Sequence, residues 1–385
     1  MTKIKNLTKA ANRIKKAIAQ GERIVLYGDA DLDGVTSVLI AQEAIKSLGG
    51  EVAAFYFPER EKEGYGVTPK AIAYLQQYAP ALLVTFDLGI SNFTEIPMAK
   101  KAGFEVIVVD HHKVLDKLPK ADIIVDPKQP GDKYPFKEFA ACGLSLQLAK
   151  ELLGKKMSDS LYQSMVELAG LGTIADMMAR EQDNVQIIAD GMDALPYSWR
   201  PGIRAFLESD IFLGESTLEQ KVQQMIAILN VRDTKNREPG AFRLLVCPSL
   251  LKAKKMVEQF AEKNKERREL IEKAAEEVRM RIFHKKAEPL VFEGSEQFEY
   301  MLLGALASII SQEANRPAFI YKKSKKGIIG SVRAPLGYDT VRAMQACDAY
   351  LDVYGGHPQA SGFETKGEHE EELGVCLTEY FKKNK

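Results

Sequence analysis

Short apolar runs alternate with amphipathic stretches along the first half of the chain. The runs are rich in β-branched residues, which is typical of buried strands, and the stretches between them repeat apolar residues every three or four positions, as a helix face does. The expected strands are 23–28, 52–57, 82–86, 106–109 and 123–125, and the expected helices are 3–20, 35–48, 69–78, 93–102, 143–153 and 158–170. This alternation predicts an α/β fold with a doubly wound, mostly parallel sheet.

The pattern changes near residue 216. The sequence then becomes charged and poor in proline, and residues 251–286 predict one long helix. Beyond Pro289, strands are expected at 290–292, 318–321 and 327–332, and helices at 300–311 and 340–349. We therefore expect an α/β domain at 1–215, a helical connector at 216–288, and a smaller α/β domain at 289–385.

Charge is balanced over the whole chain and uneven within it. The 385 residues include 53 Lys plus Arg and 53 Asp plus Glu, so net charge gives no argument for nucleic-acid, membrane or acidic partners. The expected helix 251–286 carries twelve basic and seven acidic residues, which suits a solvated connector or a basic wall beside a nucleic acid. The other local basic surface is the expected turn with Lys322, Lys323, Lys325 and Lys326.

The cysteines and the apolar runs bear on the compartment. The four cysteines are far apart along the chain and show no paired spacing; they are Cys142, Cys247, Cys347 and Cys376. We therefore expect reduced thiols, mostly buried in the core, and a cytoplasmic protein. Residues 1–16 lack the apolar segment of a secretion signal. No run approaches the roughly 18 apolar residues of a membrane span, so we expect no membrane partner.

Carboxylates and histidines follow several of the expected strands. They are Asp29, Asp31 and Asp33 after 23–28, Asp87 after 82–86, the triplet Asp110, His111 and His112 after 106–109, and Asp176 after the run 171–175. Open parallel sheets carry their chemistry at the carboxyl ends of the strands, so these side chains should meet. Divalent cations prefer oxygen ligands and Mn²⁺ also accepts imidazole, so the cluster predicts a pair of Mn²⁺ or Mg²⁺ ions.

Each of these residues alone has an ordinary structural explanation. The string 29–34 could be a Ca²⁺ loop or a plain turn, although an EF-hand needs glutamate at its twelfth position, where Ile40 stands. Asp87 and Asp176 could lie in turns or at helix ends, and His111 could be a hydrogen-bonded structural histidine. Their recurrence at the ends of successive elements favours one metal site on loops after the strands.

Four motifs resemble the DHH phosphoesterase superfamily, and within it the RecJ-like single-strand exonucleases. They are Gly-Asp-Ala-Asp-Leu-Asp-Gly-Val-Thr-Ser at 28–37, Thr-Phe-Asp-Leu-Gly-Ile at 85–90, Val-Asp-His-His at 109–112, and Leu-Gly-Thr-Ile-Ala-Asp at 171–176. The likeness continues at 126–130 and 200–204. It resumes at 330–333 and 355–362, which are similar to the family's DHH-associated domain (DHHA1).

The resemblance implies roles for individual residues. One ion would be held by Asp29 or a water together with Asp31 and Asp87, and the other by Asp33, Asp87, His111 and Asp176, with Mn²⁺ preferred and Mg²⁺ possible. Asp87, Asp110, His111 and His112 would form the catalytic set, with Asp110 orienting His111. The substrate phosphate would be bound by His112, Ser331, Arg333, Gly355, Gly356 and His357.

The resemblance also implies an activity. It is metal-dependent hydrolysis of single-stranded DNA from 5′ to 3′, in DNA repair or recombination, with a helicase or a single-strand-binding protein as a further partner. Tyr27 departs from the histidine ligand of several DHH branches, and 229–237 only loosely resembles the family's Asn-Ala-x-Gly-Arg stretch. The residues after Phe363 are too few for the OB-fold of bacterial relatives, so weak, salt-sensitive DNA binding is expected.

Two alternatives stay open. The first is a phosphodiesterase for oligoribonucleotides or cyclic dinucleotides, although the long connector and the motif at 28–37 argue against it. The second is an inactive replication scaffold, against which the intact Asp and His motifs argue.

Overall fold

The computed structural model describes residues 2–115, 117–209, 211, 217–231, 233–285, 287–325 and 327–384. Arg232, Lys326 and the expected boundary at 215–216 lie outside the described residues. The chain divides into two compact units, Met1–Glu262 and Lys263–Lys385, and each is described by itself.

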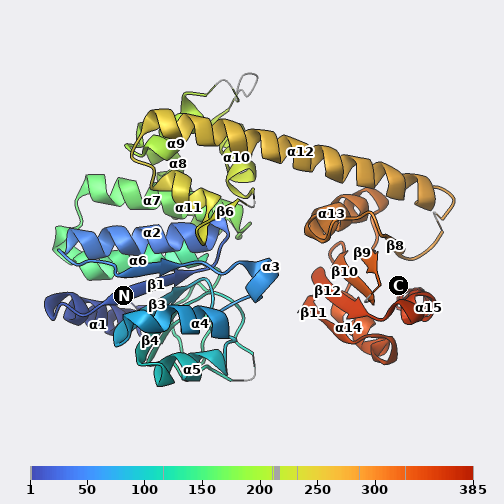
Figure 1. The fold of residues 1–385 in the computed structure, drawn as a ribbon, viewed down its shortest axis with the longest axis horizontal. Helices are drawn as coiled ribbons and strands as arrows, with labels where there is room; N and C mark the ends of the chain where they lie inside the picture. Colours follow the sequence, from blue (N-terminus) through green and yellow to red (C-terminus); the bar gives the residue numbers. More distant parts are fainter. Residues whose placement is uncertain are drawn as a thin grey trace. The chain divides into compact units, whose positions relative to one another are not determined.

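The first unit is built on a parallel sheet of five strands in the order β2-β1-β3-β4-β5 (Figure 1). The strands are β1 (Ile24–Gly28), β2 (Ala54–Tyr56), β3 (Ala81–Phe86), β4 (Phe104–Val109) and β5 (Ile123–Val125). Every neighbouring pair runs parallel. Strands β1 and β3 are buried along their whole length, as expected for a sheet covered on both faces. The predicted doubly wound α/β class is confirmed.

Successive residues of each strand enter opposite hydrophobic cores. Leu26 and Val84 belong to one core, while Val25 and Leu83 belong to the other. The larger core is covered by α1 (Leu7–Ala19), α2 (Leu32–Ser47), α6 (Ala141–Leu153) and α7 (Asp159–Ala175), and the smaller by α4 (Pro69–Leu75) and α5 (Glu95–Lys101) (Figure 1).

The region expected to be a helical connector also contains a β-hairpin. The further elements of the first unit are α3 (Arg60–Glu63), α8 (Gln182–Ala194), α9 (Pro201–Leu207), α10 (Leu218–Leu229), β6 (Thr234–Lys235), β7 (Glu238–Pro239) and α11 (Gly240–Leu245), with 3₁₀ turns at Gln76–Tyr78, Gly154–Lys156 and Leu195–Tyr197. Asn236 and Arg237 have φ of 54° and 66°, a left-handed turn that a helical pattern does not reveal. The expected long helix is present as α12 (Leu250–Ile282).

The second unit contains a mixed sheet in the order β11-β12-β10-β9-β8. Its strands are β8 (Val291–Ser295), β9 (Ala318–Ser324), β10 (Gly327–Arg333), β11 (Val353–His357) and β12 (Ala360–Thr365), and only β8 and β9 pair in parallel. One core lies under α13 (Leu303–Ala314) and the end of α12, the other under α14 (Thr340–Ala346) and α15 (Glu370–Lys383). The 3₁₀ turns are Tyr300–Leu302, Asp348–Tyr350 and Gly367–His369.

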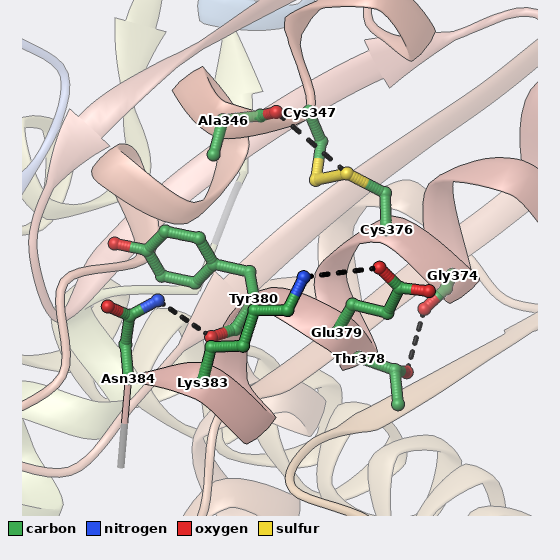
Figure 2. Close-up of a disulfide and its surroundings, with 9 residues drawn as sticks. All are labelled: Ala346, Cys347, Gly374, Cys376, Thr378, Glu379, Tyr380, Lys383 and Asn384. Atoms are coloured by element: carbon green, nitrogen blue, oxygen red, sulfur yellow. Dashed lines mark hydrogen bonds and ion pairs between the residues drawn. A yellow bond between two sulfur atoms is a disulfide. The ribbon is translucent and has the colours of Figure 1, made fainter.

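Two of the four cysteines form a disulfide, so the expectation of four reduced thiols is wrong. Cys347, just after α14, bonds to Cys376 of α15 with the Cα atoms 6.0 Å apart (Figure 2). The two helices pack against one core, and this brings together residues 29 positions apart that show no motif spacing. Cys142 and Cys247 are free and buried. Cysteine usage therefore no longer supports a reducing compartment.

Among the described residues, no helix is both long enough and apolar enough to cross a membrane.

Candidate metal centre

Three aspartates are fixed at the carboxyl edge of the first sheet by backbone hydrogen bonds that continue the strand ladder. The N–H of Asp29 donates to Phe86 O at 3.2 Å, that of Asp87 to Val109 O at 3.0 Å, and that of Asp110 to Val125 O at 3.1 Å. Each aspartate thus extends its strand by one residue. This places their side chains together at one edge, as the sequence predicts for residues at strand ends.

Three more carboxylates come from helix ends. Asp31 caps α2, because its Oδ1 accepts the N–H of Gly34 at 3.1 Å. Asp33 lies in the first turn of α2 instead of the expected loop, because the helix begins directly after Asp31. Its two oxygens accept the N–H groups of Ala141 and Cys142 at 2.8 and 2.7 Å, at the start of α6. Asp176 stands at the C-cap of α7.

His111 lies among these carboxylates. Its Nε2 is 3.2 Å from Asp87 Oδ1, 3.5 Å from Asp176 Oδ2 and 3.8 Å from Asp33 Oδ2. The histidine is 5% exposed, and neither ring nitrogen has a hydrogen-bond partner among the described residues; the same holds for Asp176 Oδ2. Buried polar atoms without partners cost about 1 to 3 kcal/mol each, so this arrangement fits a set of cation ligands better than a structural hydrogen-bond network.

The structure brings all six predicted metal residues into adjoining groups. Ligand atoms lie within 4.8 Å of one another in the groups Asp33, His111 and Asp176; Asp29, Asp31 and Asp87; and Asp87, His111 and His112. Asp87 belongs to two of these three groups, and its Oδ1 lies 3.2 Å from Nε2 of His111, a member of the third. Carboxylate oxygens with one imidazole nitrogen suit Mn²⁺ or Mg²⁺, and no cysteine belongs to these groups.

Burial and mutual repulsion perturb the carboxylates. Burial raises the pKa of Asp87 well above its ordinary value, and the charges of Asp31 and Asp33 raise it further. Burial, followed by the charges of Asp33 and Asp31, raises the pKa of Asp176 to about 7. Burial also lowers the pKa of His111, which favours the neutral imidazole that ligates metals. A divalent cation would relieve this repulsion.

Asp110 orients the ring of His112, not that of His111 as expected. Its Oδ1 lies 2.8 Å from His112 Nδ1 and accepts the backbone N–H groups of His111 and His112, while Oδ2 accepts the N–H of Ile90. The His111 ring faces the carboxylates, so only its backbone reaches Asp110. Burial opposes charge on His112, but the hydrogen bond to Asp110 and its charge raise the pKa of His112 to about 9.

Two further residues near the carboxylates are Tyr27, which stands where several DHH branches have a histidine ligand, and Arg60, which the sequence did not predict. Tyr27 points into the smaller core and donates its hydroxyl to Gly66 O at 2.9 Å, so it does not face the carboxylates. Arg60, which the sequence analysis did not single out, lies 2.5 Å from Asp29 Oδ2 and 2.7 Å from Asp31 Oδ2 through its Nη2. Its one local signal is its place between a strand and the Gly64-Tyr-Gly turn.

The candidate phosphate residues of the second unit lie together on its sheet. Strand pairing puts Arg333, Ala360 and His357 in one row, and Ser331, Gly362 and Gly355 in another. Residues opposite one another share a face, so Ser331, Arg333 and His357 lie on one glycine-rich face, with Gly356 beside them in edge strand β11. A side chain at Gly355 would meet no atom within 4 Å.

Two other predicted surfaces are engaged within their own units. Lys322 Nζ donates to Phe298 O at 2.8 Å, and Lys323 Nζ lies 2.5 Å from Glu370 Oε1, so half of the expected basic turn is already paired. Arg237, in the loosely matching segment 229–237, donates to the hydroxyl of Tyr56 at 3.0 Å and lies over the ring of Tyr74. It therefore fastens the hairpin to the sheet side of the unit.

Known proteins similar to this chain include a DHH family model and RecJ exonucleases. Residues 23–173 match the model of the DHH family, N-terminal domain. The chain is 33% identical over 380 residues to the single-stranded-DNA-specific exonuclease RecJ of Bacillus subtilis, covering 98% of this chain and 48% of that protein. It is 29% identical over 364 residues to RecJ of Thermus thermophilus, covering 94% and 52%. The chain thus spans about half the length of these two curated relatives.

The fold has a solved counterpart with a bound metal. A crystal structure of exonuclease RecJ bound to manganese matches 99% of this chain and 95% of its own, with a TM-score of 0.82 and 26% identity.

Proposed function

We propose, from the premise that this chain belongs to the DHH family and is a homologue of RecJ along nearly its whole length, that it is a metal-dependent phosphodiesterase that degrades single-stranded DNA as an exonuclease. The observation that carries the proposal is the buried ring of His111, whose unpartnered Nε2 faces the carboxylates of Asp33, Asp87 and Asp176.

The ligand groups suggest how two ions would be held. Asp33, Asp87, His111 and Asp176 would hold one ion; Asp31 and Asp87, with Asp29 or a water, would hold the other, so that Asp87 serves both. Mn²⁺ is preferred and Mg²⁺ is possible on the chemistry of these ligands. Such cations supply Lewis acidity, which lowers the pKa of water and neutralises charge that develops on a phosphate.

His112 supplies a positive charge beside this centre. Its Nδ1 is held by Asp110 at 2.8 Å, half of its side chain is exposed, and its pKa of about 9 keeps the ring protonated at neutral pH. The proton on Nε2 is then a donor for a phosphate oxygen. A fixed, charged donor of this kind stabilises the negative charge that grows on the phosphate in the transition state.

The glycine-rich face of the second unit is proposed to bind substrate phosphate. The guanidinium of Arg333 can present two parallel N–H donors to a phosphate, and Ser331 lies two residues away on the same face. The open backbone at Gly355 allows a phosphate to approach the chain closely. The exposed ring of His357 completes the set.

The remaining parts of the proposal rest on the resemblance to RecJ. They are cleavage from 5′ to 3′, a role in DNA repair or recombination in the cytoplasm, single-stranded nucleic acid as the main partner, and a helicase or single-strand-binding protein as an additional one.

The test compares three substrates in Mn²⁺: an end-labelled single strand of about 30 nucleotides, a dinucleotide and a cyclic dinucleotide. We expect progressive shortening of the long strand and no attack on its duplex form. Hydrolysis confined to the dinucleotide or the cyclic dinucleotide would support the small-substrate alternative. No hydrolysis of any of them would support the inactive scaffold.

A further inference from the structure

Gly304 lies in helix α13, where glycine is an unfavourable residue. The helix follows the 3₁₀ turn Tyr300–Leu302 without a break, and Leu302 has φ of −98° and ψ of −14°, so Gly304 stands within continuous helical backbone. Its φ is not left-handed, so any residue could adopt this conformation. Glycine loses more conformational freedom on folding than alanine and lowers helix stability. Helix formation therefore does not account for glycine at this position.

The packing of α13 does not require glycine either. The helix lies on strands β9 and β10 (Figure 1), and it contributes Leu303, Leu306, Ala307 and Ile310 to the core beneath it. In the described part of the chain, a Cβ on Gly304 would meet no core side chain and no backbone of another element within 4 Å. A close approach of helix and sheet, a common reason for glycine in a helix, is therefore not the explanation here.

The two atoms that such a Cβ would meet are polar side-chain ends on the phosphate-binding face. Nη2 of Arg333 would lie 3.4 Å from the Cβ, and Oγ of Ser331 would lie 3.5 Å from it. Both residues stand on β10, opposite Ala318 and Ile320 of β9, which belong to the core under α13. The side chains of Ser331 and Arg333 therefore converge on the space beside Gly304.

This space suits an oxygen that carries negative charge. Hydroxyl and guanidinium donors hold an acceptor at about 2.7 to 3.0 Å, so an oxygen close to the position of the absent Cβ can accept from both. The guanidinium of Arg333 is oriented in addition by its Nη1, which donates to the carbonyl of Val332 at 2.8 Å. A side chain at position 304 would occupy the same space and exclude the oxygen.

We propose that Gly304 is a specificity-determining residue of the phosphate-binding face. By carrying no side chain, it keeps open the space in which a substrate phosphate oxygen accepts hydrogen bonds from Arg333 Nη2 and Ser331 Oγ. The inference rests on the proposed function for the identity of the ligand, a phosphate of single-stranded DNA. Adding a side chain should stabilise the helix and weaken substrate binding. A purely structural role of Gly304 would not produce these two opposite effects.

The first experiment compares Gly304→Ala and Gly304→Leu with the parent, each as the full chain. The Kd for a single strand of about 30 nucleotides is measured by fluorescence anisotropy in a chelator, so that no hydrolysis occurs. We expect the Tm of Gly304→Ala to rise by about 1 to 4 °C. We expect the Kd to rise about 10-fold in Gly304→Ala and up to about 100-fold in Gly304→Leu, because the phosphate loses charge-assisted hydrogen bonds.

The matched control is Gly367→Ala, in a 3₁₀ turn of the same unit. A Cβ on Gly367 would meet no atom within 4 Å, so this variant should keep the parental Kd. A Kd within about twofold of the parent in both Gly304 variants would overturn the inference. A fall in the Tm of Gly304→Ala would also overturn it, because weaker binding would then follow from a damaged fold.

The second experiment asks whether Gly304 acts through Arg333. The Kd is measured for Gly304→Ala, Arg333→Gln and the double variant. If both changes remove the same phosphate contact, the double variant should bind no more weakly than the weaker of the two single variants. Losses that add would show that Gly304 acts elsewhere, which contradicts the proposal. Bound Mn²⁺ should be the same in the parent and in all of these variants, since none of them changes a metal residue.

Failure of the inference is distinguishable from failure of the proposed function. A parent that neither binds nor hydrolyses a single strand in Mn²⁺ would remove the proposed function and the inference with it. A parent that hydrolyses the strand, together with Gly304 variants that keep the parental Kd and kcat/KM, would remove only the inference.

Discussion

Replacing Asp87 by Asn tests the carboxylate that two of the three ligand groups share. Asp87 has φ of +62°, a left-handed conformation that Asn adopts more readily than Ala, so Asn removes the charge without adding backbone strain. The side chain of Asp87 is 3% exposed, and the Asn side chain has nearly the same shape as the Asp side chain. The effect can therefore be attributed to the lost carboxylate.

The structure gives the sign and the size of the change in stability that Asp87→Asn should cause in the metal-free protein. Ligand oxygens of Asp29, Asp31 and Asp87 lie within 4.8 Å of one another, a distance at which two unit charges repel by about 3 kcal/mol at an effective dielectric of 20. Partial protonation relieves some of this, because burial and these neighbours raise the pKa of Asp87. Asp87→Asn should therefore leave the metal-free protein as stable as the parent or stabilise it by about 1 to 3 kcal/mol.

The same substitution should abolish hydrolysis. Removing a ligand shared by two cations forfeits several kcal/mol of transition-state stabilisation, and about 4 kcal/mol corresponds to a loss of about 10³-fold in rate. The assay follows an end-labelled single strand in Mn²⁺ beside thermal melts in a chelator, with Asp193→Asn on the exposed face of α8 as the matched control. Activity within tenfold of the parent, or a clear loss of metal-free stability, would refute the reasoning.

Three further predictions address the other groups. His357→Ala should leave Mn²⁺ content unchanged by elemental analysis while kcat/KM falls about 10²-fold, and a lost metal equivalent would contradict its assignment to phosphate. Burial and the charges of Asp33 and Asp31 raise the pKa of Asp176 to about 7, so its ionisation opposes folding. The free energy of unfolding of the metal-free protein should therefore fall as pH rises from about 4 to about 7, by at most about 4 kcal/mol from this group. Asp176→Asn should flatten this pH profile, measured by chemical denaturation. Changing Lys322, Lys323, Lys325 and Lys326 to Ser should weaken binding of a 30-mer and reduce its salt dependence between about 50 and 200 mM, while hydrolysis of a dinucleotide is spared; unchanged binding would remove this turn from the substrate path.

The sequence predicted the placement of the strand-end residues well, for a physical reason. Asp29, Asp87 and Asp110 follow buried parallel strands, and the sheet ladder itself fixes such residues at one edge. His111 follows Asp110 and turns its ring toward Asp87. Periodicity and the order of the elements were enough to place this part of the site.

Other features depend on tertiary contacts that leave no local pattern. Arg60 begins α3, the short helix after β2, and meets Asp29 only in the folded chain, because no spacing in the sequence links the two residues. Asp110 orients His112 because the neighbouring His111 ring is turned toward the carboxylates. The bond between Cys347 and Cys376 likewise follows from the packing of α14 on α15.

The proposed function requires the carboxylate cluster to be a metal site. Crystals grown with Mn²⁺ and measured at the manganese absorption edge should show two anomalous peaks beside Asp87, one in contact with His111 Nε2 and Asp176 and the other in contact with Asp31. An anomalous map without a peak among these residues, from protein that hydrolyses single-stranded DNA in the same Mn²⁺ buffer, would contradict the account.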